Sequence, residues 1–362
     1  MYSESDLEAA VAAGALSPDA ANALRTYVAG SRTTPAVDEE HFRLLTGFND
    51  IFVAIAAAIL LVAVAWIGNA IPPHLGEGGP SPFGGFAVAA TAWGLAEFFT
   101  RKRRMALPSI LLLLAFAGGV LACSGFTIAF ALGEDYLRNN NEGAMIVLAL
   151  SAAITTAATW LHWKRFRVPI TVAAGAAAAV AVALALVGVA AEEIDGSRDL
   201  LLGFALLFGV GIFLFAMYWD SSDPRRETRR SDIAFWLHLL AAPMIVHPIF
   251  SLLRLNDGSA NEAEAVVVLL VYLVLGLTAL AVDRRALLVS ALAYVLWALS
   301  DLFERHGAVE LSFALTALVI GSALLLLSAF WHNARRAVVV RLPANVQVKL
   351  PVLDRISVPA AA

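Results

Sequence analysis

The chain has 362 residues, of which 60% are hydrophobic and 15% are charged, and its mean hydropathy is +0.77. Soluble domains carry about 25% charged residues, so this composition excludes an ordinary soluble protein and indicates a membrane protein. The net charge of −4 gives no basis for nucleic-acid binding, and a single cysteine, Cys123, excludes an intrachain disulfide and a cysteine-based metal site.

Residues 1–35 are predicted to form a small cytoplasmic helical hairpin followed by a linker. Gly14 suits the position just after a helix end, and Ser17 and Pro18 are typical of the start of a second helix. A hairpin of under about 40 residues has too little core to fold alone, so we expect it to dock on a protein partner or on the loops of the membrane part. Residues 36–50 are predicted to form an amphipathic helix leading to the membrane.

Residues 51–333 are predicted to form an all-α bundle of about ten membrane-spanning helices. An apolar run of about 20 residues is long enough to cross the roughly 30 Å hydrocarbon core of a bilayer as a helix. Ten such runs occur, near residues 51–71, 83–100, 107–132, 144–163, 168–191, 200–219, 233–253, 265–282, 286–303 and 311–331. Small residues in the runs 168–191 and 200–219 favour close helix contacts and predict a central position for these two. Residues 334–362 are predicted to be a cytoplasmic tail.

The distribution of cations predicts the orientation. The loops after the even-numbered runs contain 13 lysines and arginines, whereas the five loops on the other side contain four. Because cytoplasmic loops are the ones enriched in lysine and arginine, both termini are predicted to be cytoplasmic. The basic turns begin at residues 101, 164, 225 and 284. This spacing indicates either a duplicated hairpin or a simple stack of hairpins with short loops, and we favour the stack.

Ionisable and helix-breaking residues inside the apolar runs are the candidate functional residues, because such groups are costly in a bilayer. The seventh run contains His238, Pro243 and His247. Proline leaves backbone carbonyls unpaired, and histidine can exchange a proton near neutral pH. These three residues, together with Glu97 and Thr155, are candidates for lining a pathway through the bundle.

The candidates also have purely structural interpretations, which we favour for His238, His247 and Glu97 and leave open beside pathway lining for Thr155. His238 and His247 can be neutral side chains bonded to adjacent helices, and their nine-residue separation places them on opposite faces of a straight helix. Glu97 can form an i,i+4 ion pair with Arg101 near the membrane interface. Thr155 belongs to a polar stripe on the fourth run that can hold neighbouring helices together.

Sequence signatures of catalysis are missing: there is no HExxH motif, P-loop, Rossmann glycine motif or nucleophile elbow. We therefore expect no cofactor and no bound metal, and an enzyme is disfavoured.

Two short segments carry a resemblance to known proteins. The hairpin reads Ala12-Ala-Gly-Ala-Leu-Ser-Pro-Asp-Ala-Ala21, which has the form aliphatic-Gly-x-Leu-Ser-x-Asp/Glu-x-Ala, and Thr46-Gly-Phe-Asn-Asp-Ile-Phe-Val53 leads into the first apolar run. With the many apolar runs, this layout resembles multi-pass bacterial families described as predicted membrane proteins of unknown function. The resemblance implies location in the bacterial inner membrane, and it brings no catalytic or binding residues.

Two functional hypotheses follow. The first is a transporter-like protein for a small, uncharged or weakly charged molecule, with the seventh run along its pathway. The alternative is a non-catalytic membrane scaffold or sensor that recruits a protein partner through residues 1–35. An enzyme acting on lipid-linked substrates is the weakest reading. The expected partners are the lipid bilayer and a protein at the hairpin, and no nucleic acid.

Overall fold

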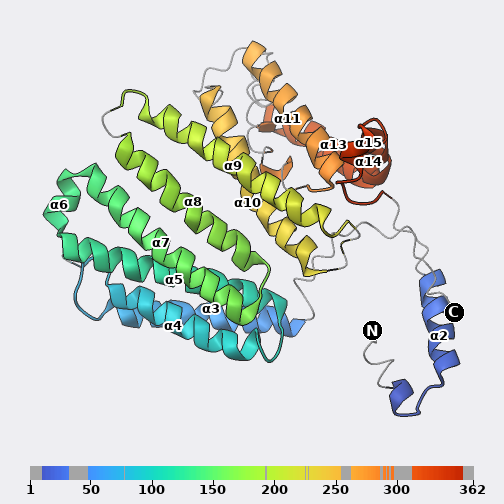
Figure 1. The fold of residues 1–362 in the computed structure, drawn as a ribbon, viewed down its shortest axis with the longest axis horizontal. Helices are drawn as coiled ribbons and strands as arrows, with labels where there is room; N and C mark the ends of the chain where they lie inside the picture. The colour runs from blue at the N-terminus through green and yellow to red at the C-terminus, as the bar shows by residue number, and fades with distance from the viewer. Residues whose placement is uncertain are drawn as a thin grey trace. The chain divides into compact units, whose positions relative to one another are not determined.

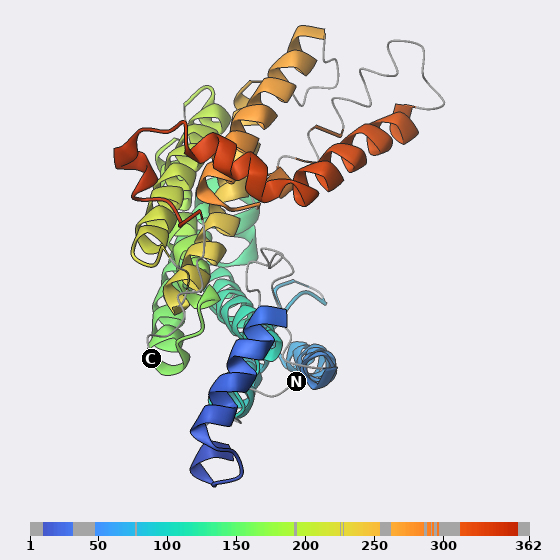
Figure 2. The same cartoon turned by 90° about the vertical axis from the view of Figure 1, so that its right-hand side faces the viewer.

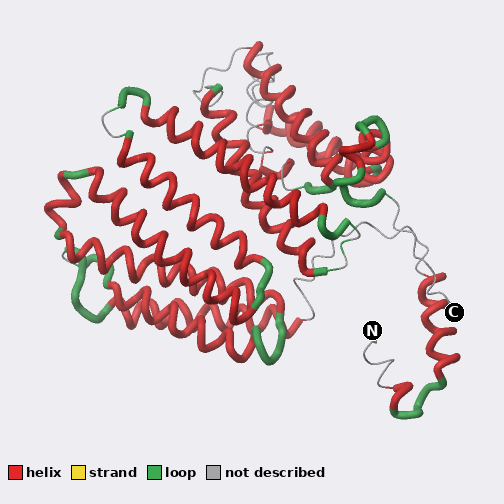
Figure 3. Tube along the Cα trace, viewed as in Figure 1, coloured by secondary structure: helices red, strands yellow, loops and turns green. Residues whose placement is uncertain are grey.

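The structure is a computed structural model, and it describes residues 10–31, 48–76, 78–191, 194–224, 226, 228–253, 262–285, 288–290, 292, 295–296 and 312–353. The chain divides into two units, Met1–Leu44 and Leu45–Ala362 (Figure 1). Throughout the described residues every regular element is a helix, as Figure 3 shows, so the predicted all-α class is confirmed for them.

The first unit contains helix α2 (Pro18–Ser31) and the turn before it. Gly14 has a φ of +70° and ends a short helical segment, as its position in the sequence predicts. The Ser17 hydroxyl accepts a hydrogen bond from the Ala20 backbone N–H at 3.1 Å and so caps α2. Residues 1–9 of the predicted hairpin, and the part of the predicted amphipathic helix before residue 48, lie outside the described residues.

In the second unit, helices that follow one another in the chain lie side by side from α3 to α10, beginning at the lower left of Figure 1, and α11 lies at the upper right. The helices are α3 (Phe48–Asn69), α4 (Pro82–Phe99), α5 (Ala106–Leu132), α6 (Glu134–Asn139), α7 (Asn141–Phe166), α8 (Ile170–Ala190), α9 (Ser197–Ser221), α10 (Arg229–Leu252), α11 (Glu262–Val282), α13 (Ser312–Ala329), α14 (Trp331–Val339) and α15 (Ala344–Gln347).

Six of these helices, α3, α5, α7, α8, α9 and α10, are long and apolar enough to cross a membrane. Helices α13 and α14 make a seventh span if they are taken together, although a bend of 74° separates them (Figure 2). The predicted runs 83–100 and 265–282 are also helical, as α4 and α11, but these two helices are not among those long and apolar enough to cross a membrane. Most of the predicted ninth run lies outside the described residues, so the count of about ten stays a prediction.

The helices joined by basic turns form the tightest pairs: α4 with α5, α7 with α8, and α9 with α10. Among the residues that the structure describes, four non-glycine residues have positive φ, and one lies at each basic turn: Arg104 (54°), Arg167 (56°), Arg226 (56°) and Asp283 (61°). A left-handed residue commonly ends a helix, so the shared geometry is compatible with a duplicated hairpin and with a simple stack of hairpins.

The expectation that the runs 168–191 and 200–219 lie at the centre was wrong. Helix α10 is the most buried span, with 50% of its apolar window buried, against 22% for α8 and 17% for α9. Helix α10 packs on α8 and α9, most extensively on α9, and its Ala242, Val246 and Phe250 share a hydrophobic cluster with α11. Burial therefore follows the contacts that a helix makes rather than its content of small residues.

The segment after α13 is packed onto the rest of the second unit as far as residue 353. Val339 and Leu350 share a hydrophobic cluster with Val282 at the end of α11. The Arg335 guanidinium, on α14, donates hydrogen bonds to the carbonyls of Pro351 at 2.6 Å and of Val352 at 3.2 Å. The region predicted as a plain tail is therefore, through this point, a folded cap on the ends of α9 and α11.

Candidate functional site

The candidate site forms where the α9–α10 hairpin closes. Asp220 lies in the last turn of α9, and His238 lies on α10, 18 residues later in the chain. The antiparallel pairing of the two helices brings the His238 Nε2 atom to 3.0 Å from the Asp220 Oδ2 atom. Both side chains are completely buried, with 0% exposure. Because an ionised carboxylate accepts and does not donate, this geometry assigns the imidazole proton to Nε2.

Arg284, just after α11, binds the same carboxylate from the other side. Its Nη2 atom lies 2.6 Å from Asp220 Oδ1, and its Nε atom lies 3.3 Å from Asp220 Oδ2. Nη2 also donates to the Ser231 carbonyl of α10 at 3.1 Å. The two-pronged contact holds the guanidinium against the carboxylate, and with the Ser231 contact it joins the ends of three helices.

A second buried carboxylate, Asp283, is the chain neighbour of Arg284. Its Oδ2 atom accepts a hydrogen bond from the Arg226 Nη1 atom at 2.9 Å, and its Oδ1 atom accepts one from the Trp331 indole at 2.7 Å. Arg226 also donates to the carbonyls of Val282 and Asp283, each at 3.1 Å. The turn after α9 is thereby bound to the turn after α11 and to α14.

The third carboxylate, Asp223, holds the start of α10. Its Oδ2 atom accepts hydrogen bonds from the backbone N–H and the hydroxyl of Thr228, at 2.9 and 2.7 Å. The Thr228 hydroxyl in turn caps α10 by accepting from the Arg230 N–H at 3.2 Å. Asp223 thus fixes the turn that carries Arg226.

These residues form what we call the charge cluster: Asp220, Asp223, Arg226, His238, Asp283, Arg284 and Arg335, all of them largely removed from solvent. Burial raises the pKa of the Asp283 carboxyl, but the nearby guanidinium groups of Arg226 and Arg335 outweigh this effect and hold its pKa below the ordinary value. Asp283 is therefore ionised at neutral pH. With three aspartates and three arginines, the cluster is electrically balanced.

His238 is held in the charge cluster by one nitrogen. Its Nδ1 atom is buried and has no hydrogen-bond partner in the described part of the chain. The ring of Phe213, on α9, packs edge-on against the imidazole at 5.1 Å between centroids. The cluster thus contains one imidazole nitrogen able to accept a proton or a hydrogen bond.

The other candidates on α10 lie away from His238. Pro243 and His247 are exposed on the opposite side of the helix, as the nine-residue separation of the histidines predicts. Helix α10 continues through Pro243 and Pro248 as one element. The structure therefore does not bring the two histidines together.

The remaining two candidates lie on other helices. Glu97, near the end of α4, makes the predicted pair with Arg101 at 3.3 Å and a closer, two-pronged contact with Arg165 of α7 at 2.7 and 2.9 Å. The Thr155 hydroxyl is buried and donates to the carbonyl of Ser151 on its own helix at 2.8 Å. Neither residue joins His238, so the predicted pathway residues form no single site.

Sequence reasoning singled out His238 but missed its partners, because Asp220, Asp283 and Arg284 were assigned to solvated loops. A signal was present. Asp220 and Asp223 come shortly before the arginines of the third basic turn, and Asp283 comes directly before those of the fourth, whereas the first turn has only Glu97 before it and residues 164–169 contain no acid. Acids next to the arginines of two basic turns indicate that the turns can form ion pairs with each other.

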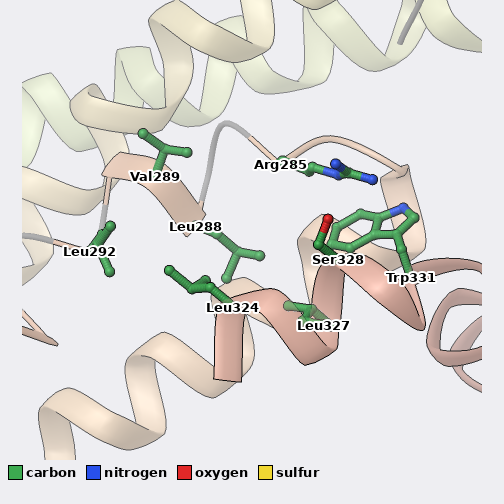
Figure 4. A pocket seen from close by; sticks show the side chains of 8 residues that line it. All are labelled: Arg285, Leu288, Val289, Leu292, Leu324, Leu327, Ser328 and Trp331. Atoms are coloured by element: carbon green, nitrogen blue, oxygen red, sulfur yellow. The ribbon is translucent and has the colours of Figure 1, made fainter. Parts of the chain in front are cut away.

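A cavity of about 220 Å³ lies beside the charge cluster (Figure 4). Figure 4 shows Arg285 and Trp331 at one end and leucines along the rest, and the Arg285 guanidinium lies 4.8 Å from the centre of the Trp331 ring. The lining is Arg285, Leu288, Val289, Leu292, Leu324, Leu327, Ser328 and Trp331. Through Trp331 the cavity wall touches Asp283, but His238 does not line it.

The described residues contain no group of three histidine, cysteine or acidic side chains able to hold a metal ion. The candidate site is therefore defined by its buried ion pairs. Comparisons with family models, with curated proteins and with solved structures found no match.

Proposed function

We propose that this chain is a ten-span protein of the bacterial inner membrane, with both termini in the cytoplasm, which binds or moves a small, uncharged or weakly charged molecule. In this proposal the charge cluster closes the cytoplasmic end of the pathway. The long apolar helices support a membrane protein, and the segregation of cations among the loops supports the orientation. The resemblance to bacterial multi-pass families supports the inner membrane.

The observation that carries the proposal is the complete burial of Asp220 and His238 against Arg284. A buried ion pair contributes little stability compared with apolar residues of the same volume, because removing both charges from water is costly. An anchor or a scaffold gains little net stability from such a group. Ionisable side chains kept inside a membrane bundle are typical of pathways and of conformational switches.

The charge cluster can close a pathway because one carboxylate connects the ends of three helices. Asp220 of α9 is shared by His238 of α10 and by Arg284, which follows α11. Moving the end of α11 away from α10 breaks the contacts of Arg284 with Asp220 and Ser231 together. The Nδ1 atom of His238 has no hydrogen-bond partner among the described residues. Once Arg284 has moved away, this atom can accept a proton or a hydrogen bond from a polar ligand.

Water access to the interior of α10 tests the proposal. In a Cys123→Ala background, a single cysteine replaces Ala242, which is fully buried one turn beyond His238, and intact cells are treated with a membrane-impermeant maleimide. We expect labelling, because a pathway must open to this position. Asn140, exposed in the loop region before α7, is the positive control. No labelling at Ala242, with Asn140 labelled normally, contradicts the proposed pathway.

The alternative, a scaffold or sensor, is supported by the separation of residues 1–44 as a unit of their own. It predicts that deletion of residues 1–35 abolishes binding of a protein partner while the membrane part folds normally. It also predicts that Ala242 stays unlabelled. The two experiments together separate the two functions.

A further inference from the structure

Two basic turns of the second unit lie next to each other. Glu97 of α4 receives two hydrogen bonds from Arg165, at 2.7 and 2.9 Å, and one from Arg101 at 3.3 Å. Helix α5 packs on both α7 and α8, so the turn after α4 and the turn after α7 are held side by side. Together the turns carry seven exposed cations, which we call the basic patch: Arg101, Lys102, Arg103, Arg104, Lys164, Arg165 and Arg167.

The basic patch keeps most of its charge. Glu97 is the carboxylate that pairs with it, and it engages Arg101 and Arg165. Over the residues that the structure describes, the other five cations make no ion pair. The next two basic turns are different, since Arg226 and Arg284 are buried against Asp283 and Asp220. The third turn also exposes Arg229 and Arg230, but the first two turns, with seven exposed cations, carry the larger share of the positive charge available to a ligand.

Aromatic rings hold three of these cations at the ends of their helices. The Lys164 Nζ atom lies 3.6 Å from the centre of the Trp160 ring, and the guanidinium of Arg167 lies 5.7 Å from Trp163. Arg103 lies 5.5 Å from the ring of Phe98. Tryptophan at the end of a spanning helix marks the level of the lipid headgroups, so the cations are held where lipid phosphates lie.

Apolar side chains lie directly beside the charges. Trp160 is 54% exposed, Leu161 is 53% exposed and Phe98 is 43% exposed. On helices that cross a bilayer, such side chains face acyl chains. A ligand that uses both the cations and these rings must have an anionic head attached to an apolar chain.

We propose that the basic patch is a binding site for an anionic phospholipid of the cytoplasmic leaflet, with its phosphate at Lys164 and Arg167 and its acyl chains along Trp160 and Leu161. Arginine binds phosphate through two parallel N–H bonds, and basic pockets on the cytoplasmic side of helix bundles bind lipid headgroups. This site is separate from the charge cluster, and the inference is independent of the proposed function.

The test uses the full chain purified in a neutral detergent. Thermal unfolding is followed while phosphatidylglycerol, phosphatidylcholine or inorganic phosphate is added. We expect phosphatidylglycerol to raise the unfolding temperature at the lowest concentrations, and the other two to have little effect. The double variant Lys164→Gln/Arg167→Gln is expected to need about 25-fold more phosphatidylglycerol for the same shift, at roughly fivefold for each surface cation.

The matched control is Arg229→Gln/Arg230→Gln, which removes the same charge from exposed positions on the third basic turn and should behave like the parent chain. Arg101, Lys102, Arg103, Arg104 and Arg165 remain in the test variant, so the charge rule still gives the same orientation. Equal loss in the control, or an equal shift with phosphatidylcholine, overturns the proposal. An equal shift with inorganic phosphate shows a free-anion site and also overturns it.

If the charge variant unfolds at a different temperature without lipid, Trp160→Leu provides the second test. It keeps every cation but removes the ring under Lys164. We expect it to weaken the response to phosphatidylglycerol and to leave the unfolding temperature without lipid unchanged. An unaltered phosphatidylglycerol response in this variant contradicts the proposed position of the lipid.

Discussion

Asp220 and Glu97 show how differently two carboxylates at helix ends behave. Both lie near the end of the first helix of a hairpin, and both bind an arginine of a later turn: Asp220 binds Arg284, and Glu97 binds Arg165. Asp220 is fully buried, whereas the Glu97 side chain is 33% exposed. Solvent screens the pair of Glu97 with Arg165 but is excluded from the pair of Asp220 with Arg284, so losing the second pair lowers the free energy of unfolding more.

Asp220→Asn is therefore expected to lower the free energy of unfolding by about 3–5 kcal/mol, because it leaves the buried Arg284 without its counter-charge. Glu97→Gln, the exposed counterpart, is expected to cost far less, because solvent screens the ion pairs of Glu97 with Arg101 and Arg165. The measurement is thermal unfolding of both variants in the same detergent. Similar effects in the two variants contradict the burial of the charge cluster.

Asp283 predicts how stability responds to acid. The pKa of the Asp283 carboxyl is below its ordinary value in the folded protein. Its ionised form therefore stabilises the fold fully above the pKa that Asp283 has in the unfolded chain, and this stabilisation is lost as the pH falls through the pKa of the folded state. The unfolding temperature should therefore fall on acidification below the ordinary aspartate pKa of about 3.9. Asp283→Asn should be less stable at neutral pH and show a smaller acid-induced decrease. A decrease as large as that of the parent chain contradicts this assignment.

At the scale of helices, the hairpin of α4 and α5 depends on glycine at specific positions. A Cβ atom added to Gly119 lies 2.8 Å from the Gly85 carbonyl oxygen and 2.8 Å from the Ala89 nitrogen, which are backbone atoms of α4. A Cβ atom added to the adjacent Gly118 meets nothing within 4 Å. Small residues let two helix backbones approach closely, and here one glycine of the pair performs this role.

Gly119→Ala is accordingly expected to destabilise the protein by about 1–3 kcal/mol, because the two helix backbones must move apart. Gly118→Ala is the matched control, and it should be neutral or stabilising by up to about 1 kcal/mol, since alanine is the better helix former. Thermal unfolding measures both. Equal effects of the two substitutions contradict the close contact of α4 with α5.

The same comparison distinguishes the glycines of α9. A Cβ atom on Gly209 lies 2.8 Å from the Met244 carbonyl oxygen of α10, whereas Gly203 and Gly211 have open space. The sequence treats these three residues alike as packing positions. Which glycine packs depends on the rotation of α9 against α10, and that is a tertiary property.

At the scale of the whole molecule, the loop charges predict which ends of the helices face the cytoplasm. In a Cys123→Ala background, a cysteine at Asn140 should react with a membrane-impermeant maleimide in intact cells. A cysteine at Ser222, also exposed but in a basic turn, should react when the membrane is permeabilised. Reaction at Ser222 in intact cells means that the orientation is reversed.

Several features follow from local sequence. The predicted run 107–132 is α5 at Ala106–Leu132, and the predicted run 168–191 is α8 at Ile170–Ala190. Length and hydropathy along the chain are enough to place such helices, because a helix satisfies its own backbone hydrogen bonds. The hydropathy pattern did not predict the bend of 74° between α13 and α14, at Phe330. The Arg335 side chain of α14 binds the carbonyls of Pro351 and Val352, which lie 16 and 17 residues later in the chain, and a local pattern does not contain such a contact.

The sequence by itself thus determined the helical class, the positions of most helices, the expected orientation and the interest of His238. The tertiary structure decided that Asp220, Asp283 and Arg284 are buried partners, that α10 is the most enclosed span, and that Glu97 joins two turns. The physical reason is the separation along the chain over which each interaction acts. Hydrophobicity acts along a single helix, whereas an ion pair between residues 64 or 68 positions apart exists because packing brings two turns together.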